Sequence, residues 1–248
     1  MLHYFPFHAS IAAPTPAKPT YHPRRKGNGW PDECPPLRAA NAFGWDILAP
    51  FTMTFRRAPE GWKHVDPVDL ESDFVWEPKG AEGTGQPMVQ TNAWFWDKGQ
   101  ELPHKISDDV WPELRDQVKV STYLWMKTDK NELLMLGDVP NRVVPWRAFT
   151  AVLDTDWYPA SYPWHGVLIL DRREKEIRID KGTPLFRLTV HRRADYHAKP
   201  MTDSGFDAFF SRGQGWLKAH ARGVVGDTAD IRGAYVKQQK VARFLQGS

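Results

Sequence analysis

Two aspartates two residues apart, Asp154 and Asp156, carry the clearest spacing for chemistry in this chain. They lie in the segment AVLDTDWYPASYPW, whose first residues are typical of a strand. Residues i and i+2 of a strand share a face, so the two carboxylates are expected to converge. Converging carboxylates suit Mg²⁺ binding or general-base catalysis, and they also cap backbone N–H groups where a strand enters a turn. Asp154 and Asp156 are therefore either catalytic groups or turn caps.

Three residues close to these aspartates in the sequence are candidates for ligand binding. Trp157 follows Asp156 directly and could form the wall of a pocket. His165 opens the next strand, and Arg187 lies on the strand after the turn at Lys181-Gly182. We expect Arg187 to neighbour His165 across the sheet, where it either binds an anionic ligand or forms a structural salt bridge.

A second constellation suggests a metal. His64-Val65-Asp66 has the H-x-D spacing, and His165 or His191 could supply a third ligand. Two histidines and a carboxylate form the facial triad of non-heme iron oxygenases. The alternative is a surface loop in which Asp66 precedes the turn-forming Pro67. The cofactor expectation is therefore iron or Mg²⁺, and whether the chain is an enzyme stays open.

The composition is that of an ordinary folded protein that is rich in tryptophan. The chain has 248 residues, of which 41% are hydrophobic and 25% are charged, and it has 12 tryptophans. These tryptophans either fill a core or line a pocket. The net charge of +3 comes from scattered basic residues, which argues against nucleic-acid binding. Cys34 is the single cysteine, so an intrachain disulfide and a thiolate metal cluster are excluded.

The sequence lacks the motifs of several function classes. There is no HExxH, no paired CxxC, no G-x-S-x-G and no GxxxxGK[ST]. No apolar run approaches the length of about 18 residues that a membrane helix needs, and the first residues do not resemble a signal peptide. We therefore expect a cytoplasmic protein without a membrane contact.

The order of elements predicts a mainly β fold, either a β-sandwich or a β-clip-like barrel, with a C-terminal helical appendage. Patterns rich in β-formers predict strands over residues 2–9, 43–56 with a break at Pro50, 73–77, 88–96, 118–128, 133–136, 147–156, 164–170, 175–180 and 184–192. A short helix is expected over 108–117, and two more follow residue 200, one from Asp203 or Ser204 and one from about Asp227.

These elements divide the chain into three parts: a proline-rich arm over 1–36, a β domain over 37–200 and the helical appendage over 201–248. Seven prolines fall within residues 13–36. Because proline lacks a backbone donor, this stretch is either a surface loop or an arm that packs on another copy of the chain. Self-association through residues 10–36 is therefore an expectation.

Four motifs in order resemble those of an uncharacterised bacterial and phage protein family. They contain Ala40-Asn41 with Gly44-Trp45, then Pro140-Asn141, then Thr155-Asp156-Trp157, then Gly182-Thr183-Pro184. The resemblance carries no mechanism. If the chain has a pocket, Asn41 and Asn141 are its candidate polar anchors, and Trp45 is a further candidate ligand-binding residue. This chain departs from the family pattern in its long arm, in Asp154 where a Glu is usual, and in its C-terminal helices.

Residues 151–190 are also similar, more loosely, to the closing strands of dUTPase-like β-clip folds, without their Gly-Arg-Ser-Ser nucleotide motif. Three functions follow as hypotheses. The first is a small-molecule-binding protein or enzyme with a Trp-lined pocket, which requires Asp154, Asp156 and Arg187 to converge. The second is a structural or assembly protein of a phage or particle, in which these side chains are dispersed. The third is the iron oxygenase.

Overall fold

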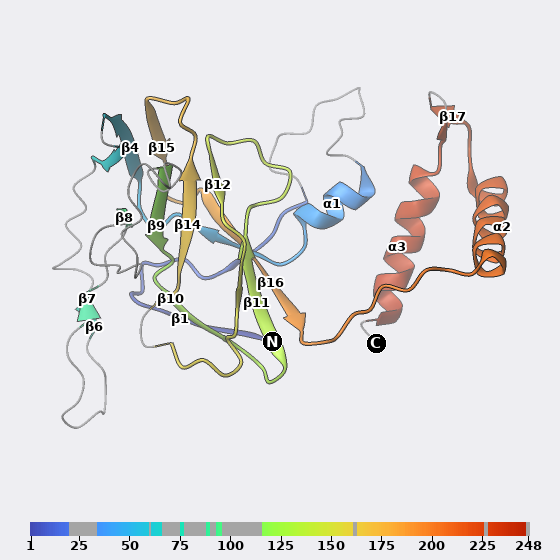
Figure 1. Ribbon diagram of the computed structural model, residues 1–248, viewed down its shortest axis with the longest axis horizontal. Helices are drawn as coiled ribbons and strands as arrows, with labels where there is room; N and C mark the ends of the chain where they lie inside the picture. The colour runs from blue at the N-terminus through green and yellow to red at the C-terminus, as the bar shows by residue number, and fades with distance from the viewer. Residues whose placement is uncertain are drawn as a thin grey trace. The chain divides into compact units, whose positions relative to one another are not determined.

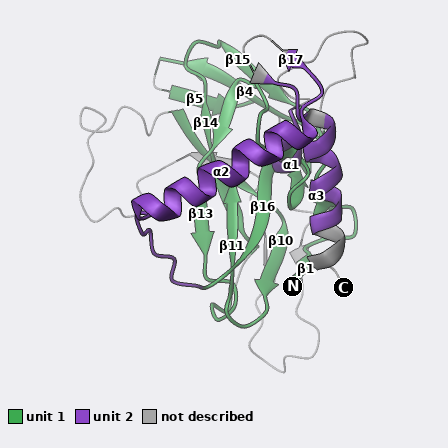
Figure 2. Cartoon of the chain, turned by 90° about the vertical axis from the view of Figure 1, so that its right-hand side faces the viewer, with its two compact units in different colours: residues 1–21, 41–193 green, residues 22–40, 194–248 purple. Residues whose placement is uncertain are grey.

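A computed structural model of the chain describes residues 1–19, 34–59, 61–65, 75–76, 88–89, 93–95, 116–160, 163–225 and 228–246. The chain forms two compact units, shown in different colours in Figure 2. The β unit comprises residues 1–21 and 41–193, and the helical unit comprises residues 22–40 and 194–248. The β unit thus includes the first 21 residues of the predicted arm.

The β unit contains three larger antiparallel sheets (Figure 1). The first has the order β13 (Ala151–Leu153), β11 (Glu132–Gly137), β16 (Pro184–Arg192), β3 (Trp45–Leu48), β2 (Thr15–Pro16). The second has the order β12 (Trp146–Ala148), β14 (His165–Leu170), β9 (Gln117–Ser121), β8 (Ala93–Phe95). The third has the order β15 (Glu176–Ile179), β4 (Met53–Ala58), β5 (Gly61–His64).

Two-stranded pairs and helices are the remaining elements of the described residues. The two-stranded pairs are β1 (Leu2–Pro6) with β10 (Leu124–Thr128), β6 (Val75–Trp76) with β7 (Met88–Val89), and β17 (Val224–Val225) with β18 (Thr228–Ala229). The helices are α1 (Pro35–Asn41), α2 (Asp203–His220) and α3 (Arg232–Gln246). The prediction of a mainly β chain with C-terminal helices is confirmed, and no sheet of the described residues closes into a barrel.

The first and second sheets share one apolar core. Phe186 on β16 is fully buried, and a Cβ added at Gly166 on β14 would lie 2.5 Å from its ring carbons. A strand of one sheet therefore packs directly on a strand of the other, and the close approach requires glycine. On β15, Ile177 and Ile179 are buried while their neighbours are exposed, as the alternating pattern predicts.

Two predicted strands are each divided into two. Residues 118–128 form β9 and β10, which belong to different sheets, because the chain turns at Tyr123 with a φ of 54°. Burial of the Tyr123 ring and a hydrogen bond from its N–H to Ser121 Oγ hold this uncommon conformation. Residues 147–156 similarly supply β12 and β13 in different sheets. The break predicted at Pro50 is confirmed, since β3 and β4 lie on either side of it.

The helical unit contains α2, the hairpin β17–β18 and α3 in chain order (Figures 1 and 2). Helix α2 begins where expected, but its N-cap is Thr202, whose side chain accepts a hydrogen bond from the Gly205 N–H. Helix α3 begins at Arg232, later than predicted, because Thr228 and Ala229 form β18. The helix expected over 108–117 lies mostly outside the described residues.

Candidate functional site

Asn41 and Asn141, which are a hundred residues apart in the sequence, meet in the structure. Asn141 Nδ2 donates a hydrogen bond of 2.9 Å to Asn41 Oδ1, and Asn41 Nδ2 donates to the Pro19 carbonyl at 3.2 Å. Asn41 is only 2% exposed, so its amide needs these partners. Asn141 has a φ of 58°, a left-handed conformation that asparagine tolerates better than most residues. The two proposed polar anchors therefore bind each other, and the Asn141 amide and the Pro19 carbonyl together hold Asn41, the last residue of α1.

Arg187 is buried and pairs with an aspartate that the sequence analysis did not single out. Its Nε donates to Asp46 Oδ1 at 2.9 Å, and its Nη1 donates to the Phe43 carbonyl at 3.0 Å. The two charged side chains are only 5% and 4% exposed, and the residues face each other between β16 and β3. One sequence signal could have found this pair: each is a lone charge within an apolar strand, WDIL and PLFRLTV.

Backbone contacts also join the segments that carry the sequence motifs. Gly44 has a φ of 89°, and a Cβ placed on it would lie 2.0 Å from the Leu188 carbonyl oxygen. Only glycine fits this position. Trp45 is half-buried and pairs with Leu188, and the Ala49 N–H donates to the Thr183 carbonyl at 2.7 Å. Three of the four motifs that carry the family resemblance thus form one structural junction, which we call the motif junction.

Asp154 and Asp156 converge on the Arg193 guanidinium, but both lie beyond β13, which ends at Leu153, so they do not share the strand face that was expected. Arg193 donates to both oxygens of Asp156, at 2.8 and 3.0 Å, and also to Asp154. Its hydrogen bonds lower the pKa of Asp156 below the ordinary value of 3.8, and its positive charge acts in the same direction. A carboxylate held ionised by a bidentate arginine is a weak base, so this arrangement favours the structural interpretation. Arg193 was visible in the sequence only as part of a basic pair.

Thr155, which lies between these aspartates, faces inward. Its hydroxyl lies 2.8 Å from the Thr128 hydroxyl, and the Thr128 N–H donates to the Thr155 carbonyl at 3.2 Å. Thr155 is 2% exposed. The Thr-Asp-Trp motif therefore fastens the end of β13 to β10 from one side and to Arg193 from the other.

The structure does not bring Arg187 close to Asp154 and Asp156, although the predicted catalytic pocket requires this. Arg187 and Arg193 lie six residues apart along one strand direction, a separation of roughly 20 Å. The expectation that Arg187 neighbours His165 across a sheet is wrong, because β16 and β14 belong to different sheets. Trp157 is 67% exposed and stacks edge-on against Tyr158, so it does not line an enclosed pocket.

The predicted iron ligands lie on three different sheets. His64 is on β5, His165 on β14 and His191 on β16, while Asp66 lies outside the described residues. His64 packs against Phe55, and His191 Nε2 lies 2.7 Å from the Thr189 hydroxyl. Burial lowers the pKa of His165, and the charge of Lys119 lowers it further. The described residues contain no group of three histidine, cysteine or acidic side chains that could hold a metal ion.

Helix α2 carries the most prominent exposed apolar surface of the helical unit. None of its residues is buried, and Phe206, Phe209 and Phe210 are each 52–53% exposed. We expected a helix here from the sequence, but no site on it. No helix in the described part of the chain is long and apolar enough to cross a membrane.

Comparison of the sequence with protein-family models found no match, and comparison with curated proteins found no relative. The function therefore has to be argued from the geometry of this chain.

Proposed function

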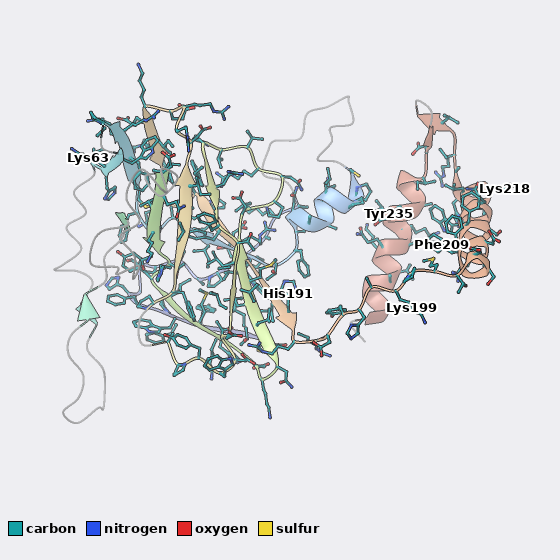
Figure 3. The ribbon with its side chains drawn as sticks, in the orientation of Figure 1. Lys63, His191, Lys199, Phe209, Lys218 and Tyr235 are labelled. Carbon is teal, nitrogen blue, oxygen red and sulfur yellow. The ribbon has the colours of Figure 1, made fainter. Side chains whose placement is uncertain are left out.

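We propose that this chain is a non-enzymatic assembly protein, in which the β unit is a rigid body and α2 pairs with α2 of a second copy. The observation that carries the proposal is the face formed by Phe206, Phe209 and Phe210, which we call the phenylalanine face (Figure 3 labels Phe209). Residues at i, i+3 and i+4 lie on one side of a helix. The rings of Phe206 and Phe210 stack at 5.9 Å and 25°.

The sequence of α2 makes a helix that needs a partner. Gly205, Gly213 and Gly215 lie within it, and each costs roughly 1 kcal/mol of helix stability relative to alanine. Helices of this length gain most of their stability from packing an apolar face rather than from propensity. Because no residue of α2 is buried within the chain, an external contact would supply the missing packing.

The charges of α2 favour a second copy of the same helix as that partner. Asp203 and Asp207 lie in its first half, and Arg212 and Lys218 lie in its second half. In an antiparallel pair, the acidic half of each helix lies beside the basic half of the other. Such an arrangement is self-complementary about a twofold axis, the commonest symmetry of soluble oligomers.

The arrangement of the β unit supports a role without catalysis. The charged and polar residues that suggested an active site pair with one another in the motif junction and around Arg193. The self-association expected through residues 10–36 stays a prediction. Within the described part of that segment, Thr15 and Pro16 form β2 and pair with β3 of the same chain. The family resemblance likewise stays a prediction.

The experiment is the mass of the full chain in solution, measured by light scattering after size exclusion over a range of concentrations. We expect a dimer that becomes a monomer when Phe206, Phe209 and Phe210 are all replaced by serine. The matched control replaces Val143 and Val152, exposed apolar residues of the β unit, by serine, and it should remain a dimer. A monomer at every concentration, or a serine variant with the mass of the unaltered chain, would refute the proposal.

A further inference from the structure

A groove lies in the helical unit between the C-terminal end of α2 and the first part of α3. Its volume is about 700 Å³, and it is open on one side. Sites for small molecules typically measure roughly 300–1,000 Å³. Ala219, Ala221, Gly233 and Ala234 contribute small walls, which leave room for the atoms of a ligand.

The groove also carries two positively charged side chains, and one of them, Arg222, is joined to Asp230 through a backbone hydrogen bond. Arg222 and Lys237 line it, and neither side chain forms an ion pair or hydrogen bond within the described part of the chain. None of the described lining residues is acidic. This differs from the β unit, where Arg187 and Arg193 both bind aspartates. The groove therefore presents free cationic donors beside an apolar wall.

Trp216 orients two further polar side chains of the groove. Its carbonyl can only accept, so the His220 Nδ1 at 2.9 Å carries the proton and donates to it. The two rings stack at 4.7 Å. The Trp216 indole N–H donates to Gln238 Oε1 at 3.1 Å, which leaves the amide NH₂ of Gln238 as a donor. A donor fixed by neighbouring contacts binds with less loss of conformational freedom.

We propose that this groove binds a small phosphate monoester with an apolar substituent. Guanidinium groups bind phosphate oxygens in a bidentate manner, lysine supplies a compact positive charge, and the Gln238 amide supplies a further donor. The alanine and glycine wall accommodates the apolar substituent. The proposal goes beyond self-association and does not depend on it, because the residues of the phenylalanine face do not line the groove.

Isothermal titration of the full chain with phenyl phosphate tests this site. Replacing Arg222 and Lys237 by glutamine should weaken binding by about tenfold or more, since each hydrogen bond to a charged group is lost. The matched control replaces Lys175 and Lys181 of the β unit by glutamine, which removes two positive charges from exposed residues that do not line the groove. This control should bind within about twofold of the unaltered chain, because neither of its residues lines the groove.

The competing outcomes are distinguishable. Equal weakening in both double variants would show diffuse attraction by a basic surface and would overturn the proposal, as would the absence of binding at millimolar phenyl phosphate. Benzoate or phenol binding as tightly as phenyl phosphate would overturn the assignment to a phosphate. Inorganic phosphate binding equally well would overturn the role of the apolar wall. If the glutamine variant loses helical circular dichroism, the variant Arg222→Lys with Lys237→Arg replaces it. This variant should bind within a few fold of the unaltered chain but with a different binding enthalpy. Unchanged enthalpy and affinity would overturn direct contact of these side chains with the phosphate.

Discussion

Polar pairs such as Arg187–Asp46 and Asn41–Asn141 lie in the β unit, whereas the helical unit leaves both apolar and cationic groups exposed. Arg187 and Asp46 are almost fully buried and bind each other, and Asn41 binds Asn141. On α2, by contrast, Phe206, Phe209 and Phe210 are about half exposed. A satisfied interior makes a body stable, while exposed apolar and charged groups are the ones available for binding.

The contrast between the two units indicates that exposed and buried side chains of this chain have different roles. The charged residues of the β strands appeared suited to chemistry, yet they stabilise the fold. The phenylalanines of α2, by contrast, lie about half exposed on the surface. If the comparison is correct, substitutions in the β unit change stability, and substitutions in the helical unit change association or binding.

The largest effect on stability is expected from Arg187→Met. It leaves the Asp46 carboxylate buried without its partner, which should cost about 3–5 kcal/mol of unfolding free energy. Urea denaturation measures this, with Arg178→Gln as the control because Arg178 and Asp180 form an exposed ion pair. The control should change stability by less than about 0.5 kcal/mol. The double variant Asp46→Leu with Arg187→Met should recover part of the lost unfolding free energy. A double variant less stable than Arg187→Met alone would contradict the assignment of Asp46 as the partner of Arg187.

Gly166→Ala should destabilise the β unit by roughly 1–3 kcal/mol, because the new methyl group meets the buried ring of Phe186. Combining it with Phe186→Leu tests the cause. If the ring contact is responsible, the two changes together cost less than the sum of their separate effects. Strict additivity would show that the strain lies elsewhere.

Arg193→Gln should produce a smaller effect that depends on pH. Arg193 lowers the pKa of Asp156 in the folded state, so the pair contributes stability above the ordinary pKa of 3.8. That contribution is lost as the pH falls through the lowered pKa. The stability difference between Arg193→Gln and the unaltered chain, measured by urea denaturation from pH 7 to pH 2, should therefore shrink below about pH 4. A constant difference across this range would mean that Asp156 is not the partner that matters.

The smallest effect on stability is expected from replacing the three phenylalanines of α2 by serine. These side chains contribute little to the packing of the β unit, since none of them is buried. The thermal midpoint of the β unit, followed by near-ultraviolet circular dichroism of the monomeric protein at low concentration, should stay unchanged. A fall of several degrees would show that the phenylalanine face stabilises the chain itself.

The sequence predicts strands best where alternation is regular and local. Residues 164–170 and 175–180 contain strands as expected, because their burial alternates along the chain, and 184–192 is a strand whose central residues are all buried. The division of 118–128 could not be predicted, because Tyr123 adopts its positive φ through burial and contacts supplied by the rest of the fold.

The candidate site shows the same limit. The convergence of Asp154 and Asp156 was predicted from a shared strand face, whereas both residues lie beyond the end of β13. The identity of their partner did not follow, because Arg193 reaches them only through the pairing of β11 with β13 and β16. The Asn41–Asn141 and Asp46–Arg187 pairs join residues a hundred or more positions apart, which no local pattern records.

A charge-exchange experiment tests the central claim most directly. One variant carries Asp203→Lys and Asp207→Lys, and the other carries Arg212→Glu and Lys218→Glu, so that each α2 helix becomes wholly basic or wholly acidic. With one variant labelled with ¹⁵N, native mass spectrometry distinguishes all species. The account predicts monomers of each variant alone and a mixed dimer when the two are combined. Dimers of each variant alone, or no mixed dimer, would contradict antiparallel pairing of α2.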